Sequence, residues 1–189
     1  MMQWYFIRHG EIESNIKRIY AGWSEEDLTP RGSRQAREAA KKLASFEIDK
    51  IYTSPLKRSV QTADIIGNFL YKIPIVEEAF KELRLGIWEG LNEEEVGRKF
   101  PDEWQTWNTR PAELILDGRE TLYGLLDRVL SGMRKIRLNE NSSTVLVITH
   151  VAIIRVLLLY TQKMDLNLYR TIPVPNGKIF KIDDKLISL

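Results

Sequence analysis

The two histidines of this chain stand in the same kind of place, directly after an apolar run that predicts a buried strand. His9 follows the aromatic and β-branched residues 4–7 and Arg8, and His150 follows residues 144–149. A single histidine beside an apolar run is more often structural than chemical. Two of them at strand ends favour a shared site, because open α/β sheets bind ligands at the carboxyl ends of their strands.

Two arginines extend this candidate site. Arg8 precedes His9, and Arg58 falls within about two turns of the start of a helix that is expected after a strand at 48–53. Because the carboxyl ends of parallel strands converge, both arginines and both histidines can share one pocket. Guanidinium groups, imidazoles and a helix amino terminus match a phosphoryl group, whose oxygens accept planar, bidentate donors. The residues therefore predict a phosphate site.

What the chain lacks narrows the chemistry. It has no cysteine, no glycine-rich nucleotide loop, no serine nucleophile elbow and no phosphoaspartate signature. The two histidines lack the local spacing of a zinc site, so we expect no metal and no other cofactor. Imidazole is then the best available nucleophile, and a phosphohistidine intermediate would divide phosphoryl transfer into two easier steps. Arginines would stabilise the charge of the transition state.

The composition is that of an ordinary globular protein. A net charge of +2 and a charged fraction of 29% give no electrostatic reason to expect nucleic acid or a membrane surface as a partner. The apolar runs are shorter than the roughly 18 residues of a membrane span, and no charged leader or cleavage site precedes the first strand. We expect a cytoplasmic protein whose partner is a small molecule, and a homodimer is left open.

The apolar pattern predicts alternating strands and helices over most of the chain. Strands are expected at 4–7, 48–53, 73–76, 144–149, 172–174 and 179–182, and helices at 29–44, 54–70, 121–138 and 151–160, with a further short helix after Asn92. Such alternation is typical of an α/β protein, here a three-layer α/β/α sandwich with a mostly parallel sheet and helices on both faces. We expect residues 1–189 to form one domain.

Residues 78–118 depart from this pattern. Their first part is neither helical nor strand-like, and their second part, with Trp104 and Trp107, is typical of short helical turns around a local core. Long irregular segments in compact domains are usually functional or mobile, so we expect this insertion to cover the active site and to set substrate preference. Spacing alone predicts that Glu82, within it, is an exposed loop carboxylate.

Several motifs, in order along the chain, resemble those of the histidine phosphatase superfamily, also called phosphoglycerate mutase-like. They are Arg8-His9-Gly10-Glu11, Asn15, Gly22, Leu28, Gly32, Ser54-Pro55-Leu56-Lys57-Arg58, Gln61-Thr62-Ala63, Glu82 four residues before Gly86, Trp88-Glu89-Gly90 and Thr149-His150. Each motif is weak alone, but together they are specific and span nearly the whole chain. Residues 88–90 and 107–121 resemble the small phosphatase branch, which includes α-ribazole phosphatase-like and broad-specificity enzymes.

The resemblance implies roles for individual residues. His9 would be the nucleophile. Glu82 would be the general acid that protonates the leaving alcohol, and then the base that activates water. The phosphoryl group would be held by Arg8, Arg58 and His150, with Asn15 as a further donor in the pocket.

Gly22 and Val151 complete the candidate substrate-binding residues. Val151 stands where the family usually has glycine or another small residue, and Ala21 where relatives often have a polar one. These differences predict a pocket wall of altered shape.

Three functions are compatible with these motifs. The leading one is a metal-independent phosphomonoester hydrolase that acts on small phosphorylated metabolites through a phosphohistidine. The first alternative is a cofactor-dependent phosphoglycerate mutase, which returns the phosphoryl group to another substrate hydroxyl instead of water. The second is a catalytically silent phosphate-binding module, which is disfavoured because every matched catalytic position is filled.

Overall fold

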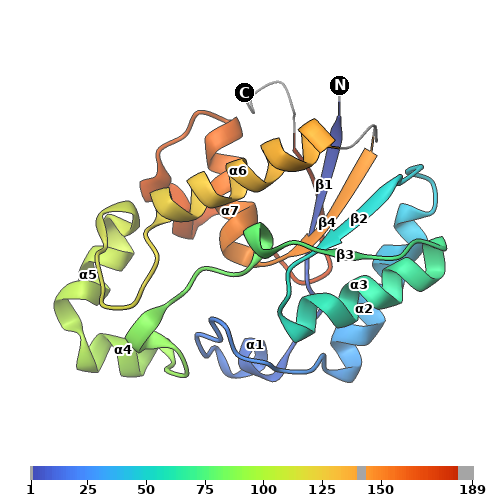
Figure 1. The fold of residues 1–189 in the computed structure, drawn as a ribbon. Helices are drawn as coiled ribbons and strands as arrows, with labels where there is room; N and C mark the ends of the chain where they lie inside the picture. Colours follow the sequence, from blue (N-terminus) through green and yellow to red (C-terminus); the bar gives the residue numbers. More distant parts are fainter. Residues whose placement is uncertain (1, 140–143, 183–189) are drawn as a thin grey trace.

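The computed structural model describes residues 2–139 and 144–182, in which five strands form one mixed sheet (Figure 1). The strands are β1 (Gln3–Arg8), β2 (Lys50–Thr53), β3 (Ile75–Val76), β4 (Thr144–Thr149) and β5 (Ile179–Ile182), in the order β3-β2-β4-β1-β5. Neighbours among β1 to β4 pair in parallel, whereas β5 runs antiparallel to β1. The predicted mostly parallel sheet is confirmed.

Helices cover both faces of the sheet. The two cores contain α2 (Pro30–Leu43) and α3 (Lys57–Leu70) on one face, and α6 (Leu122–Asn139) and α7 (Val151–Thr161) on the other. The alternation of side chains along β1 explains this arrangement. Trp4 and Phe6 enter the core with α6 and α7, and Tyr5 and Ile7 enter the core with α2 and α3. The three-layer α/β/α fold is therefore confirmed.

The segment between β3 and α6 consists of short helical pieces. These are η1 (Glu78–Phe80), η2 (Gly86–Trp88), α4 (Glu93–Lys99), α5 (Pro101–Thr109) and η3 (Pro111–Glu113); the chain also contains α1 (Glu13–Lys17) and η4 (Leu166–Thr171). The predicted short helical turns in the second part of the segment are confirmed, whereas its first part, predicted to be neither helical nor strand-like, contains two 3₁₀ turns. Asn92 caps α4 in a reciprocal capping box with Glu95. The rings of Trp88 and Trp107 meet edge to face at 6.1 Å, so Trp107 belongs to the core, as predicted.

Two sequence expectations about elements were wrong. Residues 172–174 are not a strand, because Pro173 and Pro175 have no N–H for a ladder. The second helix begins at Lys57 after Leu56, and not at Ser54, whose hydroxyl lies 2.6 Å from Nε2 of His150. A serine followed by a proline, as at 54–55, is a sequence signal for a helix cap and a first helical turn, but here the Ser54 hydroxyl contacts His150. The sequence also predicts a loop at 139–143, between the helix at 121–138 and the strand at 144–149; residues 140–143 of it lie outside the described residues.

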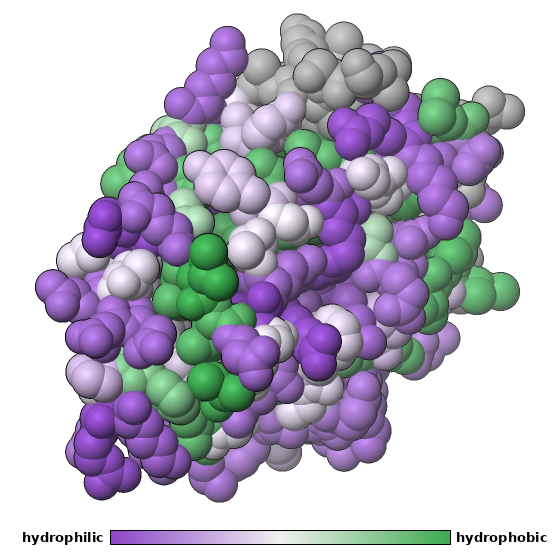
Figure 2. Space-filling view, turned by 60° about the vertical axis from the view of Figure 1, so that its left-hand side comes forward, coloured by the Kyte–Doolittle hydropathy of each residue, from purple (hydrophilic) through white to green (hydrophobic). Residues whose placement is uncertain are grey.

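The outer surface is largely polar. Hydrophilic residues make up most of the face seen in Figure 2, and the hydrophobic residues there occupy limited areas. Among the helices of residues 2–139 and 144–182, none combines the length and the apolar character needed to cross a bilayer.

Candidate active site

His9 lies directly after β1 and is only 3% exposed. Its Nδ1 lies 2.7 Å from the carbonyl oxygen of Gly10, and its Nε2 lies 3.2 Å from Nε of Arg58. A carbonyl only accepts a hydrogen bond and a guanidinium only donates. Nδ1 therefore carries the ring proton, and Nε2 presents its lone pair.

Arg58 is held in the first turn of α3 and is 1% exposed. Its Nη1 donates to the carbonyl of Ser24 at 2.7 Å, and its Nη2 donates to the carbonyl of Gly22 at 2.6 Å. Gly22 has φ of 48°, a left-handed conformation that favours glycine. The loop thus fixes the guanidinium so that its third nitrogen, Nε, faces His9.

His150 directly follows β4 and is fully buried, with its ring centroid 5.2 Å from that of His9. Its Nε2 lies 2.6 Å from the hydroxyl of Ser54 and 3.3 Å from that of Ser59. Its Nδ1 is buried and has no hydrogen-bond partner in the described part of the chain. That nitrogen is available to a ligand.

Arg8 and Asn15 lie near His9 and line a second part of the candidate site. Arg8 donates from Nη1 to the carbonyl of Val174 at 2.7 Å, while its buried Nε has no partner within the described ranges. Nδ2 of Asn176 donates to the carbonyl of His9 at 2.9 Å and to Oδ1 of Asn15 at 3.0 Å. Arg8, Asn15 and Asn176 line a cavity of about 390 Å³. Because Oδ1 of Asn15 accepts, its amide nitrogen remains as a donor.

Glu82 lies between η1 and η2 and is 7% exposed, so the exposed carboxylate predicted from spacing alone is wrong. Its Oε1 accepts from the backbone N–H of Leu83 at 2.9 Å. Together with Val151, Glu82 lines a cavity of about 170 Å³. Tyr20 and Glu93 line both this cavity and the one beside Arg8, so the two are neighbours.

The walls of the smaller cavity come from distant parts of the chain. The insertion supplies Glu82, Leu83, Leu85, Glu93 and Trp107, and the α7–η4 region supplies Val151, Ala152, Arg155, Tyr169 and Arg170. Arg155 and Arg170 add positive charge beside Glu82, and neither was predicted. Both are isolated in the sequence, and no local motif marks them.

Burial sets the protonation of the site. Burial, followed by the charges of Arg58 and Arg8, lowers the pKa of His9 well below 6.5. Burial and the same charges also lower the pKa of His150. Burial raises the pKa of Glu82 above 4.5, although the positive charge of Arg58 opposes this shift. Burial therefore favours the neutral forms of both imidazoles and shifts the Glu82 carboxyl group toward its neutral form.

The structure brings Arg8, His9, Arg58 and His150 to one edge of the sheet and adds Glu82 beside them. Gly22 presents its carbonyl to Arg58, and Val151 lines the cavity wall. Ser54, Ser59 and Asn176 were not predicted as site residues. Ser54 before a proline and Asn176 before a glycine are also ordinary turn signals, and Ser59 stands in no recognisable local motif.

An imidazole with its lone pair on Nε2, beside guanidinium donors and a buried carboxyl group, is an arrangement suited to phosphoryl transfer. The comparisons with known proteins agree: the chain belongs to the histidine phosphatase superfamily (branch 1), whose family model matches residues 4–185. The predicted resemblance is confirmed, and the chain is an enzyme of the phosphoglycerate mutase-like phosphatase class.

Individual relatives include phosphatases and mutases. The chain is 32% identical to phosphoserine phosphatase 1 of Hydrogenobacter thermophilus, over 88% of this chain and 79% of that protein. It is 34% identical to a 2,3-bisphosphoglycerate-dependent phosphoglycerate mutase of Cytophaga hutchinsonii, over 84% and 76%. The solved structure of Bacillus stearothermophilus YhfR matches with a TM-score of 0.89 and 27% identity, over 97% of this chain and 91% of that one.

Proposed function

We propose that this enzyme hydrolyses small phosphomonoesters without a metal, through a phosphohistidine on Nε2 of His9. In the first step the Nε2 lone pair forms an N–P bond, the P–O bond to the alcohol breaks, and the carboxyl group of Glu82 gives its proton to the leaving oxygen. In the second step the Glu82 carboxylate takes a proton from a water molecule whose oxygen attacks phosphorus. The N–P bond breaks, inorganic phosphate leaves, and Glu82 is protonated again.

One observation carries this proposal: Nδ1 of His9 donates to the Gly10 carbonyl, so the lone pair is on Nε2. A ring held in this tautomer is ready to attack without losing a proton first. The lowered pKa of His9 supports the same state, because a protonated ring has no lone pair on Nε2.

The phosphoryl oxygens would be bound by donors that have no other partner. Nε of Arg8 and Nδ1 of His150 are both buried and unpaired in the described structure. Arg58 already points Nε at the attacking nitrogen, and it would transfer this hydrogen bond to a phosphoryl oxygen when Nε2 bonds to phosphorus. Asn15 would be a fourth donor, Gly22 would position Arg58, and Val151 would shape the wall beside the leaving group.

The cavity beside Glu82 supports a small leaving alcohol that carries an anionic group. Arg155 lies in the wall of this cavity, and its Nε donates to the carbonyl of Ile172. No carboxylate among the described residues forms an ion pair with Arg155. Its positive charge would therefore be balanced by the substrate. A carboxylate on the leaving alcohol meets this requirement, and the names of the phosphoserine phosphatase and phosphoglycerate mutase relatives agree with it.

The test is to incubate the purified enzyme with 2-phosphoglycolate, 3-phosphoglycerate, phosphoserine and p-nitrophenyl phosphate in excess chelator, and to trap the phosphoenzyme by acid quench. We expect phosphate release and a base-stable, acid-labile phosphoryl label that His9→Ala abolishes. Labelling that persists in His9→Ala would exclude His9 as the nucleophile. Folding of the variant is checked by circular dichroism.

The two alternatives give different results in the same assay. A mutase would release little phosphate and would interconvert phosphoglycerates when 2,3-bisphosphoglycerate is added; the 34% identity to a mutase is the reason to test it. A silent binding module would bind phosphate but would never be labelled.

A further inference from the structure

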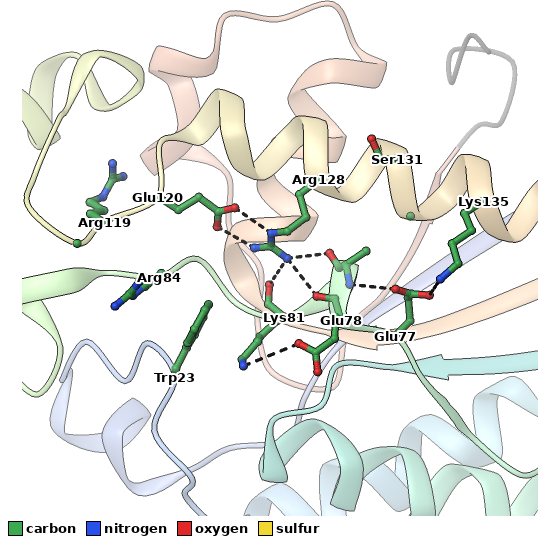
Figure 3. A pocket seen from close by; sticks show the side chains of 13 residues that line it. Trp23, Glu77, Glu78, Lys81, Arg84, Arg119, Glu120, Arg128, Ser131 and Lys135 are labelled. Carbon is green, nitrogen blue, oxygen red and sulfur yellow. Dashed lines mark hydrogen bonds and ion pairs between the residues drawn. The ribbon is translucent and has the colours of Figure 1, made fainter.

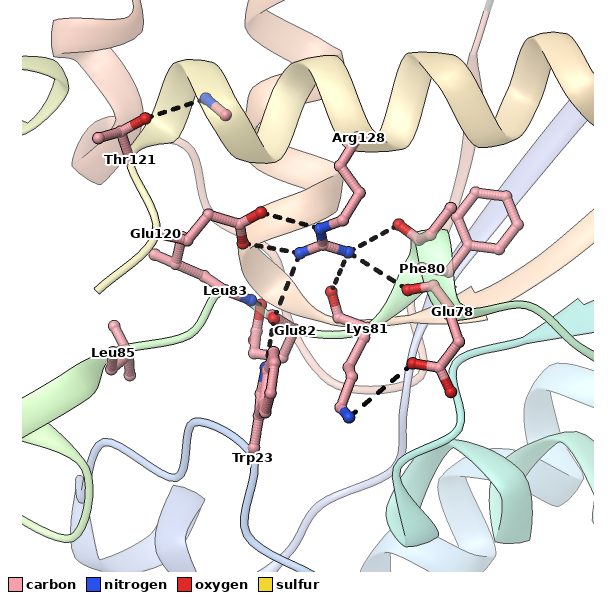
Figure 4. Close-up of polar contacts among 12 residues, drawn as sticks. Trp23, Glu78, Phe80, Lys81, Glu82, Leu83, Leu85, Glu120, Thr121 and Arg128 are labelled. Atoms are coloured by element: carbon pink, nitrogen blue, oxygen red, sulfur yellow. Dashed lines mark hydrogen bonds and ion pairs between the residues drawn. The ribbon is translucent and has the colours of Figure 1, made fainter. Parts of the chain in front are cut away.

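Arg128 of α6 donates hydrogen bonds to the main chain of the segment that carries Glu82 (Figure 4). Nη1 of Arg128 donates to the carbonyls of Ala79 at 2.9 Å and Lys81 at 3.0 Å, and its Nη2 lies 3.5 Å from the carbonyl of Glu82 itself. A guanidinium presents its donors in a fixed plane. Arg128 therefore sets the path of several consecutive residues at once.

Arg128 is itself fixed by Glu120. Nε of Arg128 donates to Oε1 of Glu120 at 2.8 Å, and Nη2 donates to Oε2 at 2.7 Å, which makes a bidentate ion pair. Both side chains are largely shielded from solvent, at 27% and 22% exposure. The backbone N–H of Glu120 also donates to the carbonyl of Arg84 at 3.0 Å. The pair is thus tied to the Glu82 segment at two places.

Trp23 holds the same carbonyl from the opposite direction. Its indole Nε1 donates to the carbonyl of Glu82 at 2.8 Å. Trp23 stands between Gly22 and Ser24, whose carbonyls hold Arg58. One loop therefore orients both the guanidinium beside His9 and the backbone of Glu82.

These contacts lie on the far side of the main chain from the substrate cavity. Trp23, Glu120 and Arg128 line a separate groove of about 770 Å³, which Figure 3 shows between α6 and the segment before Glu82. The Glu82 side chain lines the 170 Å³ cavity instead. A change at Arg128 would therefore reach the reaction only through the main chain.

We propose that Arg128, clamped by Glu120 and assisted by Trp23, is a positioning residue for Glu82: it holds the backbone so that the carboxyl group meets the leaving oxygen. This inference rests on the proposed role of Glu82 as the general acid. A displacement of about 1 Å in a reacting group can cost about 100-fold in rate, so support of the backbone has a kinetic consequence. Arg128 does not touch the substrate.

The test uses the dependence of rate on the leaving group, which loss of stability alone would not change. An activated ester such as p-nitrophenyl phosphate needs little protonation, whereas an alkyl phosphate needs the acid. In Arg128→Leu, we expect kcat/KM for an alkyl phosphate to fall by at least about tenfold, and kcat/KM for p-nitrophenyl phosphate to fall by less than about threefold. Arg128→Lys keeps the charge without the planar fork and should give an intermediate value.

Lys135→Met is the matched control. Lys135 lies on the same helix and lines the same groove, but its ion pair is with Glu77 at 3.2 Å, outside the residues that Arg128 holds. We expect Lys135→Met to change kcat/KM for the alkyl phosphate and for p-nitrophenyl phosphate by the same factor. Trp23→Phe keeps an aromatic ring but removes the N–H that donates to the Glu82 carbonyl. Like Arg128→Leu, it should lower kcat/KM for the alkyl phosphate more than for p-nitrophenyl phosphate. If Arg128→Leu does not fold, Arg128→Lys and Glu120→Gln are used to test the same difference.

The outcomes separate this inference from the proposed function. If the unaltered enzyme forms no phosphoenzyme, the proposed function itself is wrong. If Glu82→Gln selectively slows the alkyl ester but the Arg128 variants slow both esters equally or neither, only the positioning role is overturned. A selective effect in Arg128→Leu without one in Glu82→Gln would also overturn it, because the effect would not pass through Glu82.

Discussion

Nε of Arg58 donates to the Nε2 lone pair of His9 across 3.2 Å, so the nitrogen that we propose as the nucleophile is already in contact with a cation. The guanidinium therefore lies where the oxygens of an attacked phosphoryl group would arrive. Its other two nitrogens are tied to main-chain carbonyls, so little rearrangement is needed to stabilise the transition state.

Arg58→Lys should lower kcat/KM by about 100-fold, because an ammonium cannot reach His9, Gly22 and Ser24 at once. Steady-state kinetics with p-nitrophenyl phosphate measure this loss, and thermal unfolding shows whether the variant is folded. A decrease of less than about threefold in a folded variant would argue against a phosphoryl contact by Arg58.

The reaction rate should fall at both low and high pH, because the proposed reactive form of the enzyme has a neutral His9 and a protonated Glu82. The pKa of His9 is lowered by burial and by Arg58, so the loss of rate in acid should begin only well below pH 6.5. The pKa of Glu82 is raised above 4.5 by burial, so the acid is lost as the pH rises through that raised value.

Comparing the pH profile of the unaltered enzyme with that of Glu82→Gln shows how much of the loss of rate at high pH is due to ionisation of Glu82. The ionisation of the substrate phosphate is common to both enzymes and cancels in the ratio of their kcat/KM values. For an alkyl phosphate, the kcat/KM of the unaltered enzyme divided by that of Glu82→Gln should fall as the pH rises. A ratio that is independent of pH would contradict the role of Glu82 as the acid.

Gly10→Ala should destabilise the fold and disturb the site together. A β-carbon at Gly10 would collide with the main chain of Gly32, reaching 2.8 Å from its carbonyl carbon. Overpacking of this kind costs about 1–3 kcal/mol, and the Gly10 carbonyl also holds Nδ1 of His9. Denaturant unfolding and kcat/KM should both report the loss. Gly124→Ala is the control, because its β-carbon would meet only a threonine hydroxyl, at 3.2 Å, and a side-chain atom of Glu120.

Arg155→Gln should change substrate preference. We expect kcat/KM for 2-phosphoglycolate to fall by about 10- to 100-fold, the equivalent of a charged hydrogen bond of about 1.5–3 kcal/mol. The value for 2-hydroxyethyl phosphate, which lacks the carboxylate, should hardly change. Equal losses with both esters would mean that Arg155 does not bind the leaving group.

The fold could be predicted from the sequence because its core strands are strongly apolar and its long helices have a continuous buried face. The pairs Trp4 and Phe6, and Tyr5 and Ile7, alternate between the two cores. One error arose from the proline inside the apolar run at 172–174, and the other arose where a side chain with an ordinary turn signal has a tertiary partner. Ser54 was expected to cap a helix but contacts His150.

The site could be predicted in part. Histidines at the ends of two strands pointed to the pocket, because parallel topology brings those ends together. Glu82 is buried by parts of the chain that have no periodic pattern, so its place could be expected only from the family resemblance. Arg128 and Arg155 gave no local signal, because both donate to backbone carbonyls of remote segments. Glu120, the side-chain partner of Arg128, precedes the helix that carries Arg128 and so forms no helical pair with it.

The two side chains at the proposed reaction centre, His9 and Arg58, are held by peptide carbonyls: Gly10 for His9, and Gly22 and Ser24 for Arg58. A peptide carbonyl is present whatever amino acid occupies the position, provided that the backbone path is kept. The reactive centre is thus insulated from mutation in much of its surroundings. We expect that lining residues other than Glu82, such as Leu85, Trp107 and Val151, can be varied to select new esters while the proposed chemical step is kept.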